Sequence, residues 1–111
     1  MNEGSVLLAS LPQADGKWKI RPVIALRKMV PYDDVLVCGV STKLRHEVAG
    51  FDEIIAVGDS DYLSSGLAEA SLIRLGYLGI VCTADIAGSL GSISPQRYRR
   101  LLTKLSEYLV K

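Results

Sequence analysis

The chain has 111 residues, of which 49% are hydrophobic and 23% charged, and its formal net charge is +1. This size and composition are typical of one globular domain spanning residues 1–111. No apolar run approaches the ~18 residues needed to cross a bilayer, and no excess of positive charge marks a broad nucleic-acid-binding surface. A membrane span is therefore excluded, and any nucleic-acid site must be a local patch.

The first part of the chain predicts three strands separated by turns. Val6–Leu11, Ile20–Arg27 and Val35–Ser41 are rich in the apolar and β-branched residues that favour extended backbone. Between them, Pro12–Lys17 and Pro31–Asp34 supply the Pro, Asp and Gly residues that turns require.

The middle of the chain predicts shorter elements. Lys43–Phe51 is expected to be a loop of mixed charge, and Glu53–Val57 alternates weakly, which indicates a strand. Turns are expected at Gly58–Asp61 and Ser64–Gly66. The two aspartates of the first turn are interpreted as turn-building residues rather than as metal ligands.

Two extended runs and one helix are expected in the last part. Ser71–Leu75 and Tyr77–Thr83 are separated by Gly76, which indicates a bulge or a bend. Residues from about Ser94 to Val110 should be helical, because Ser94 suits an N-cap and a proline follows at the first helical position. The apolar face of this helix comprises Tyr98, Leu101, Leu102, Leu105, Tyr108 and Leu109. The cationic strip of Arg97, Arg99, Arg100 and Lys104 is expected to be solvated, and guidance of RNA is the alternative.

Strands at short spacing followed by one helix indicate a mainly β fold. We expect a small, curved antiparallel sheet or barrel of about five to seven strands with a C-terminal helix. The absence of alternating strands and helices, and of a GxGxxG or phosphate-loop sequence, argues against a Rossmann-type nucleotide-binding unit.

The two cysteines indicate a cytoplasmic protein. Cys38 and Cys82 lie in apolar runs without metal-type spacing, so buried thiols are expected rather than a disulfide. Met1–Ser5 carries no basic segment, and no secretory signal is expected.

Polar groups at the ends of two predicted strands suggest a ligand. Arg21 stands just before a core-like run, and Ser41 and Thr42 stand just after one. An arginine and two hydroxyls placed together can hold a phosphate, so a nucleic acid is the first ligand to consider.

The order of short motifs resembles the MazF/PemK-like toxins of bacterial type II toxin–antitoxin systems. In chain order, the matching segments are Gly4–Leu8, Leu11–Pro12, Arg21–Leu26, Tyr32–Cys38, Val40–Lys43, Ser65–Leu67, Ser71–Arg74 and Leu90–Ile93. The resemblance implies an SH3-like curved antiparallel barrel with a C-terminal helix, assembled as a homodimer. It also implies cofactor-free, metal-independent cleavage of single-stranded RNA (mRNA), which stops translation, and a cognate antitoxin protein that blocks the site.

The resemblance implies that Arg21, Ser41 and Thr42 are catalytic. A guanidinium offers paired donors to the charged phosphorane of RNA cleavage and stays charged at any relevant pH. The alternative for Arg21 is a surface charge or a salt-bridge partner. The alternative for the two hydroxyls is that they end the strand and cap its loop.

The remaining site residues are RNA-binding candidates. Arg74 follows an apolar run, as an RNA-binding arginine does in some members, but Gly76 stands where those members have an acid. The alternative for Arg74 is an ion pair with Glu69 or Asp34.

Ser5 and the first loop also depart from the family. That loop contains Lys17, Trp18 and Lys19, and an aromatic ring flanked by cations can stack on an RNA base. The alternative for Trp18 is that it anchors the loop by hydrophobic contact or belongs to a partner interface. These departures leave open a second function, an RNA- or protein-binding module without cleavage activity.

Overall fold

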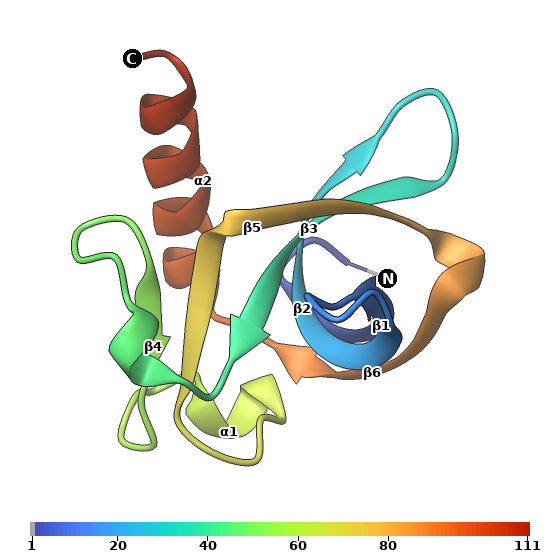
Figure 1. The fold of residues 1–111 in the computed structure, drawn as a ribbon. Helices are drawn as coiled ribbons and strands as arrows, with labels where there is room; N and C mark the ends of the chain where they lie inside the picture. Colours follow the sequence, from blue (N-terminus) through green and yellow to red (C-terminus); the bar gives the residue numbers. More distant parts are fainter. Residues whose placement is uncertain (1) are drawn as a thin grey trace.

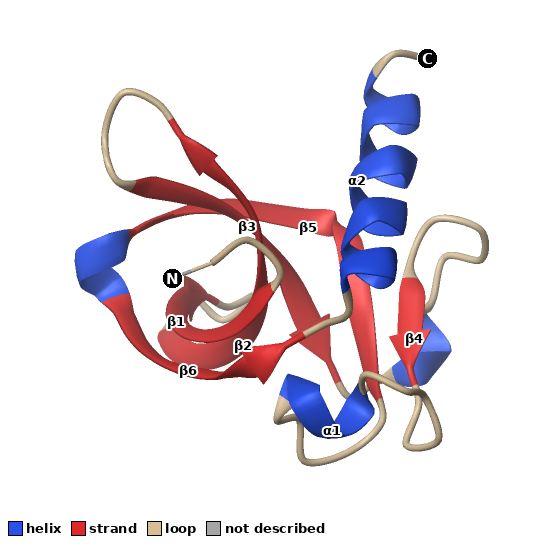
Figure 2. Cartoon of the chain, turned by 180° about the vertical axis from the view of Figure 1, so that it is seen from behind, coloured by secondary structure: helices blue, strands red, loops and turns tan. Residues whose placement is uncertain are grey.

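A curved, six-stranded antiparallel sheet forms the body of the structure, a computed structural model that describes residues 2–111 (Figures 1 and 2). The elements in chain order are β1 (Ser5–Pro12), β2 (Trp18–Met29), β3 (Asp34–Ser41), η1 (Leu44–His46), β4 (Glu53–Ile55), α1 (Tyr62–Ser65), β5 (Ser71–Cys82), η2 (Thr83–Asp85), β6 (Ile86–Ser92) and α2 (Pro95–Leu109). The strand order is β4-β5-β3-β2-β1-β6. The mainly β fold with a C-terminal helix is confirmed. Within the described part of the chain, no helix is both long and apolar enough to cross a membrane.

Strand β5 is one bent strand, where the sequence predicted two extended runs. Cys38 of β3 pairs with Leu78 of β5, whereas the next residue, Gly39, pairs with Arg74. Residues 75–77 therefore face no partner on β3, and the bulge includes Gly76, as predicted. Figure 1 shows β5 turning sharply part of the way along its length. The bend carries β5 from its pairing with β4 to the curled part of the sheet.

Strand β6 was not predicted, because its serines and glycines give a weak strand signal. It pairs with β1 through two register shifts, and it packs closely against α1. A Cβ atom added to Gly91 would lie 2.0 Å from the carbonyl oxygen of Ser64, and one added to Gly66 would lie 2.1 Å from that of Leu90. Gly66 also ends α1 with a φ of 72°, a conformation that glycine adopts without strain. Both glycines are therefore required for this close approach.

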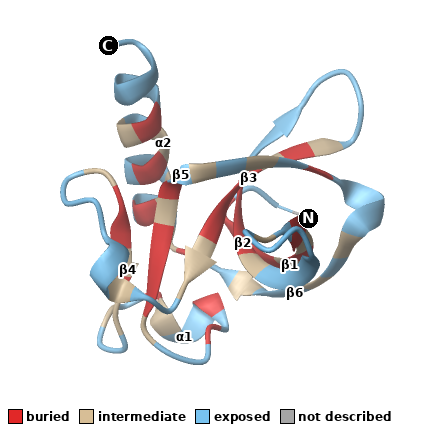
Figure 3. Ribbon diagram, in the orientation of Figure 1, coloured by how far each residue is buried: buried red, intermediate tan, exposed pale blue. Residues whose placement is uncertain are grey.

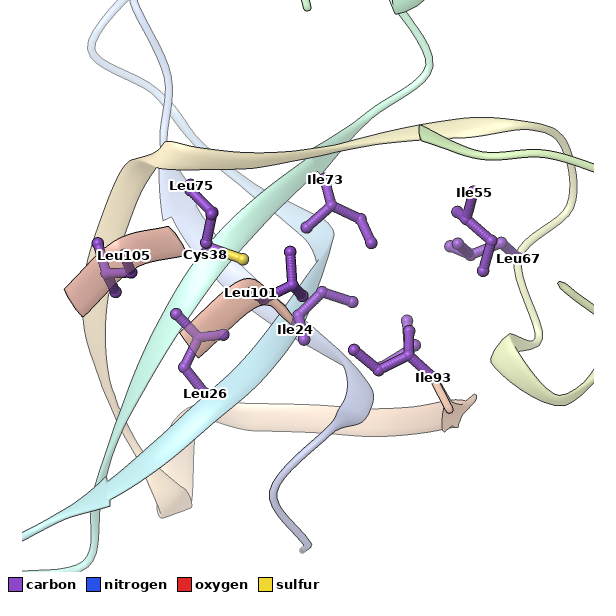
Figure 4. Packing of buried hydrophobic residues seen from close by; sticks show 11 residues of the cluster. Ile24, Leu26, Cys38, Ile55, Leu67, Ile73, Leu75, Ile93, Leu101 and Leu105 are labelled. Carbon is purple, nitrogen blue, oxygen red and sulfur yellow. The ribbon is translucent and has the colours of Figure 1, made fainter. Parts of the chain in front are cut away.

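The sheet buries apolar side chains on both faces. Ile24 and Leu26 belong to the cluster under α2, together with Leu101 and Leu105 of that helix (Figure 4). Val23 and Ala25 point to the opposite face and join a second cluster with residues of β1, β3 and β5. Burial on both faces explains why the apolar run in β2 is continuous rather than alternating. Figure 3 shows the buried side of α2 turned toward the sheet.

The helix α2 begins and ends as predicted, but its first arginine is buried rather than solvated. The Ser94 hydroxyl accepts a hydrogen bond from the Arg97 N–H at 3.1 Å. Arg97 is only 6% exposed, and its guanidinium donates to Asp61 (Nε to Oδ2, 2.8 Å), Glu53 (2.9 Å) and Asp59 (3.0 Å). The prediction of a fully solvated cationic strip is therefore wrong at Arg97. A buried charge requires such partners, and they come from the loop and strand that precede α1.

Two further cations share Glu53 with Arg97. The Glu53 carboxylate lies 3.1 Å from Arg100 Nη2 and 3.1 Å from Lys104 Nζ. We call Arg97, Glu53, Asp59 and Asp61 the buried charge cluster. This cluster ties the start of α2 to β4 and to the turn at residues 56–61, where Asp59 also accepts the N–H of Ala56 at 2.9 Å. The interpretation of Asp59 as a turn-building residue is confirmed.

The buried charge cluster should make the fold sensitive to acid. Burial acts to raise the pKa values of Asp61 and Glu53. Hydrogen bonds from Arg97 and the Ser94 N–H to Asp61, and from Arg100 and Lys104 to Glu53, outweigh it and lower both pKa values below the ordinary 3.8 and 4.5. Since the folded state then binds these protons less readily than the unfolded state, the stabilisation is complete above about pH 5 and is lost as the pH falls through the lowered values.

Urea unfolding from pH 7 to pH 3 checks this expectation. The free energy of unfolding should be nearly constant from pH 7 to about pH 5 and should fall below that. Asp61→Asn should be less stable than the wild type at pH 7, and its free energy of unfolding should fall less steeply as the pH is lowered. A wild-type unfolding midpoint that is unchanged at pH 3 would contradict the assignment.

The two cysteines differ in environment. Both are free thiols, so the expectation that they form no disulfide is confirmed. Cys38 is buried in the cluster under α2, and its burial raises its pKa to about 12. Cys82 is exposed, so the prediction of two buried thiols is wrong for this residue, which lies at the end of β5 where η2 begins.

Candidate nucleic-acid interface

The strand register brings Arg21, Ser41 and Arg74 to one face of the sheet. Gly39 of β3 pairs with Val23 on one side and with Arg74 on the other. Side chains alternate along a strand, so Arg21 shares the face of Val23, and Ser41 shares the face of Gly39. Arg21 and Arg74 lie on strands separated only by β3, a distance of about 9–10 Å between strand axes. Their long side chains can therefore reach one ligand.

Neither arginine is neutralised by a neighbouring carboxylate. Arg21 is exposed and Arg74 is half-buried, and within residues 2–111 neither forms a salt bridge. The alternative of an ion pair between Arg74 and Glu69 or Asp34 is not observed. Both guanidinium groups therefore keep their donors for an anion.

Tyr77, which the sequence did not single out, organises this face. Its ring covers Gly39, where an added Cβ would lie 3.3 Å from the ring. The Arg74 guanidinium lies 5.8 Å from the ring centroid, a cation–π distance. The Tyr77 hydroxyl donates to the carbonyl oxygen of Pro12 at 2.8 Å. Tyr77 thus links the first loop to Arg74. No local motif could reveal this role, because it depends on the bulge in β5 and on the missing side chain of Gly39.

The two hydroxyl candidates differ in position. Ser41 is the last residue of β3 and is half-buried, and Thr42 lies beyond the strand and is exposed. The Ser41 hydroxyl accepts the N–H of Lys43 at 3.1 Å. It therefore caps the loop, as the alternative interpretation holds. This contact uses an acceptor position and leaves the hydroxyl proton free to donate to a phosphate oxygen.

The first loop projects its cations and its tryptophan into solvent. Lys17, Trp18 and Lys19 are all exposed. They follow a turn in which Gly16 has a φ of 82°. Lys19 shares the face of Arg21, whereas strand alternation places Trp18 on the opposite side. Trp18 is 66% exposed and borders a groove with Leu78 and Ile80 of β5. The structure thus extends the Arg21 face with a lysine rather than with the aromatic ring.

The acidic groups nearest to α2 lie away from Arg21 and Ser41. Asp61 and Glu53 belong to the buried charge cluster on the other side of the sheet. Within residues 2–111, no three His, Cys, Asp or Glu side chains are placed to share a metal ion. The chemistry available at the interface is that of two guanidinium groups, a hydroxyl and nearby lysines.

Comparison with solved structures reveals the same fold in two mycobacterial proteins. The structure resembles the Mycobacterium tuberculosis toxin MazF-mt6 with a TM-score of 0.69 and 18% sequence identity, covering 95% of each chain. It also resembles an endoribonuclease in complex with its cognate antitoxin from Mycobacterial species, with a TM-score of 0.71 and 16% identity, covering 98% of this chain and 94% of the other. No protein-family model and no curated protein sequence matches the chain. The MazF/PemK-like fold predicted from the sequence motifs is confirmed.

Proposed function

We propose that this chain is the toxin of a type II toxin–antitoxin system and a metal-independent endoribonuclease that cleaves single-stranded RNA. The observation that carries the proposal is the convergence of Arg21, Ser41 and Arg74, free of carboxylate partners, on one face of a fold shared with a toxin and an endoribonuclease. Cleavage of mRNA in the cytoplasm would arrest translation and growth.

Arg21 carries the largest share of the proposed chemistry. In RNA cleavage the 2′-hydroxyl loses its proton to a solvent base and attacks phosphorus, and the bond from phosphorus to the 5′ oxygen breaks as that oxygen gains a proton from water. Negative charge builds on the non-bridging oxygens between these steps. The paired donors of Arg21 bind those oxygens most strongly when that charge is greatest. Arg74, oriented by Tyr77, supplies the second cation.

The hydroxyls position the phosphate. Ser41 donates its proton to a non-bridging oxygen while its own oxygen stays held by the Lys43 N–H. Thr42 is adjacent and exposed, and we propose that it can take over part of this task. Lys17 and Lys19, which are exposed, bind the RNA outside the scissile phosphate.

Removing both hydroxyls should slow cleavage more than removing either one. If Thr42 substitutes for Ser41, Ser41→Ala alone should cost less than the roughly 10²-fold typical of losing a preorganised donor. The Ser41→Ala/Thr42→Ala double variant should lose more than the two single variants combined, because they share a task. Single-turnover cleavage of one RNA measures this. Equal rates in the wild type and the double variant would remove the hydroxyls from the mechanism.

The proposed assembly is a two-fold homodimer, with the RNA or the antitoxin lying along a groove at the interface. Trp18, Ile20, Leu78 and Ile80 are exposed apolar side chains that such an interface could cover. The cationic Arg21 face suits an acidic antitoxin segment that folds on binding. Light scattering at micromolar concentration tests the assembly, and a monomer would contradict it.

Two observations favour a second candidate function, a module that binds RNA or protein without cleaving it. Gly76 provides no acid or base beside Arg74, and the Ser41 oxygen is engaged in the loop. Purified protein that retains a long single-stranded RNA intact would support this candidate.

Expression in a bacterium tests the proposed function as a whole. Induction of the chain should arrest growth, and co-expression of the gene beside it should relieve the arrest. Normal growth with the protein accumulated in folded form would contradict the assignment as a toxin.

A further inference from the structure

We propose that a pocket beside Arg74 binds one nucleotide of the RNA strand and stacks its base on Tyr108, an inference that rests on the proposed RNA-cleaving function. The pocket has a volume of about 560 Å³ and is open to solvent. Its walls are the loop at residues 46–52, the bend of β5 and the last turns of α2. Figures 1 and 2 both show this loop beside α2. The volume lies within the range of small-ligand sites in proteins.

An aromatic pair forms one wall of the pocket. The rings of Phe51 and Tyr108 lie 4.9 Å apart between centroids, with an interplanar angle of 41°. Phe51 is partly buried against the core under α2, so it anchors the pair. Tyr108 is 56% exposed and lines the pocket. Single-stranded nucleic acids use such exposed rings as stacking platforms for their bases.

Cations around the pocket suit the phosphates on either side of that base. Arg74, Lys104 and Lys111 line it, and the Lys111 Nζ lies 5.5 Å from the centroid of the Tyr108 ring. Since Lys104 is paired with Glu53 at 3.1 Å, Arg74 and Lys111 are the cations that can meet a phosphate. Arg74 belongs both to this pocket and to the face that carries Arg21. An RNA strand with its scissile phosphate at Arg21 and Arg74 would therefore place a neighbouring nucleotide at Tyr108.

The two carboxylates of the pocket have separate tasks. Asp52 is buried, and its oxygens accept the N–H groups of Val48 at 2.9 Å and Leu75 at 3.1 Å. Asp52 therefore holds the loop to β5, and the wall that carries Phe51 is preformed. Glu107 is exposed and forms no salt bridge within the described chain. Its carboxylate can accept a hydrogen bond from an amino or imino N–H group of the base.

Binding of a non-cleavable RNA tests the pocket. The probe is a fluorescein-labelled single-stranded 2′-O-methyl RNA, which lacks the attacking hydroxyl, titrated in EDTA and followed by anisotropy. Tyr108→Ala should weaken its binding by roughly 5- to 100-fold, the range for losing one base–aromatic stack, whereas Tyr108→Phe should retain it. Tyr32→Ala is the matched control, because Tyr32 is exposed at the distant β2–β3 turn, and it should bind as the wild type does. Circular dichroism verifies the fold of each variant.

The outcomes separate this inference from the proposed function. Equal binding by the wild type and Tyr108→Ala overturns the pocket, even if unmodified RNA is cleaved. Binding that depends on Tyr108 without cleavage of unmodified RNA supports the pocket and overturns the ribonuclease. No binding of RNA by the wild type overturns both. A changed oligomeric state of Tyr108→Ala in light scattering overturns the pocket, because it assigns Tyr108 to a protein interface.

Discussion

Replacing Arg97 by alanine should destabilise the protein by about 3–5 kcal/mol, the usual cost of removing one partner from a buried ion pair. The substitution leaves Asp61 and Glu53 buried without the guanidinium that donates to both of them. The Ser94 cap and the apolar face of α2 would remain, but the start of the helix would lose its attachment to β4 and to the turn at residues 56–61. Urea unfolding at pH 7 measures the difference.

Arg99→Ala is the matched control for this prediction. Arg99 is exposed, two residues along the same helix, and its removal should change the free energy of unfolding by less than ~0.5 kcal/mol. Arg97→Lys should fall between the two, because lysine restores the charge but not the fork of donors. Equal stability of Arg97→Ala and Arg99→Ala would show that the buried charge cluster makes no net contribution to the free energy of unfolding.

Replacing Arg21 by alanine should slow RNA cleavage by roughly 10²-fold or more, the scale for losing a preorganised donor to the transition state. The fold should survive, because Arg21 is exposed and forms no salt bridge with another described residue. Single-turnover cleavage at saturating protein separates this loss from a loss of binding. The rate constant should fall much more than the affinity for RNA.

Two variants define what the Arg21 result means. Arg21→Lys should recover only part of the rate, because an ammonium cannot make paired hydrogen bonds to two phosphate oxygens. Arg27→Ala should cleave as the wild type does, since Arg27 lies on the same strand, has a side chain that is 63% exposed and is outside the site. Unchanged cleavage by Arg21→Ala would remove this residue from the mechanism.

Local signals in the sequence were sufficient for most of the fold. The start of α2 follows from a serine and a proline whose effects act within one turn, and the apolar runs of β1, β2 and β3 follow from residue type alone. Strand β6 was missed, because its pairing with β1 depends on close packing at Gly91 and Gly66 rather than on strand-forming side chains.

Contacts between distant residues account for what the sequence did not reveal. Arg97 is buried because acids 36 to 44 positions away converge on it, and a helical repeat alone carries no sign of them. The candidates Arg21, Ser41 and Arg74 could be named from motifs, but their shared face follows from a strand register that only the structure provides. The roles proposed for Tyr77 and Tyr108 depend on their positions near Arg74 in the folded chain, which no local sequence pattern indicates.

The most direct test of the central claim is incubation of the purified protein with a long single-stranded RNA in EDTA, analysed on a denaturing gel. The proposed function predicts discrete fragments that accumulate with time, and much slower accumulation with Arg21→Ala. An RNA that stays intact with folded wild-type protein, or fragments that form equally fast with Arg21→Ala, would contradict it.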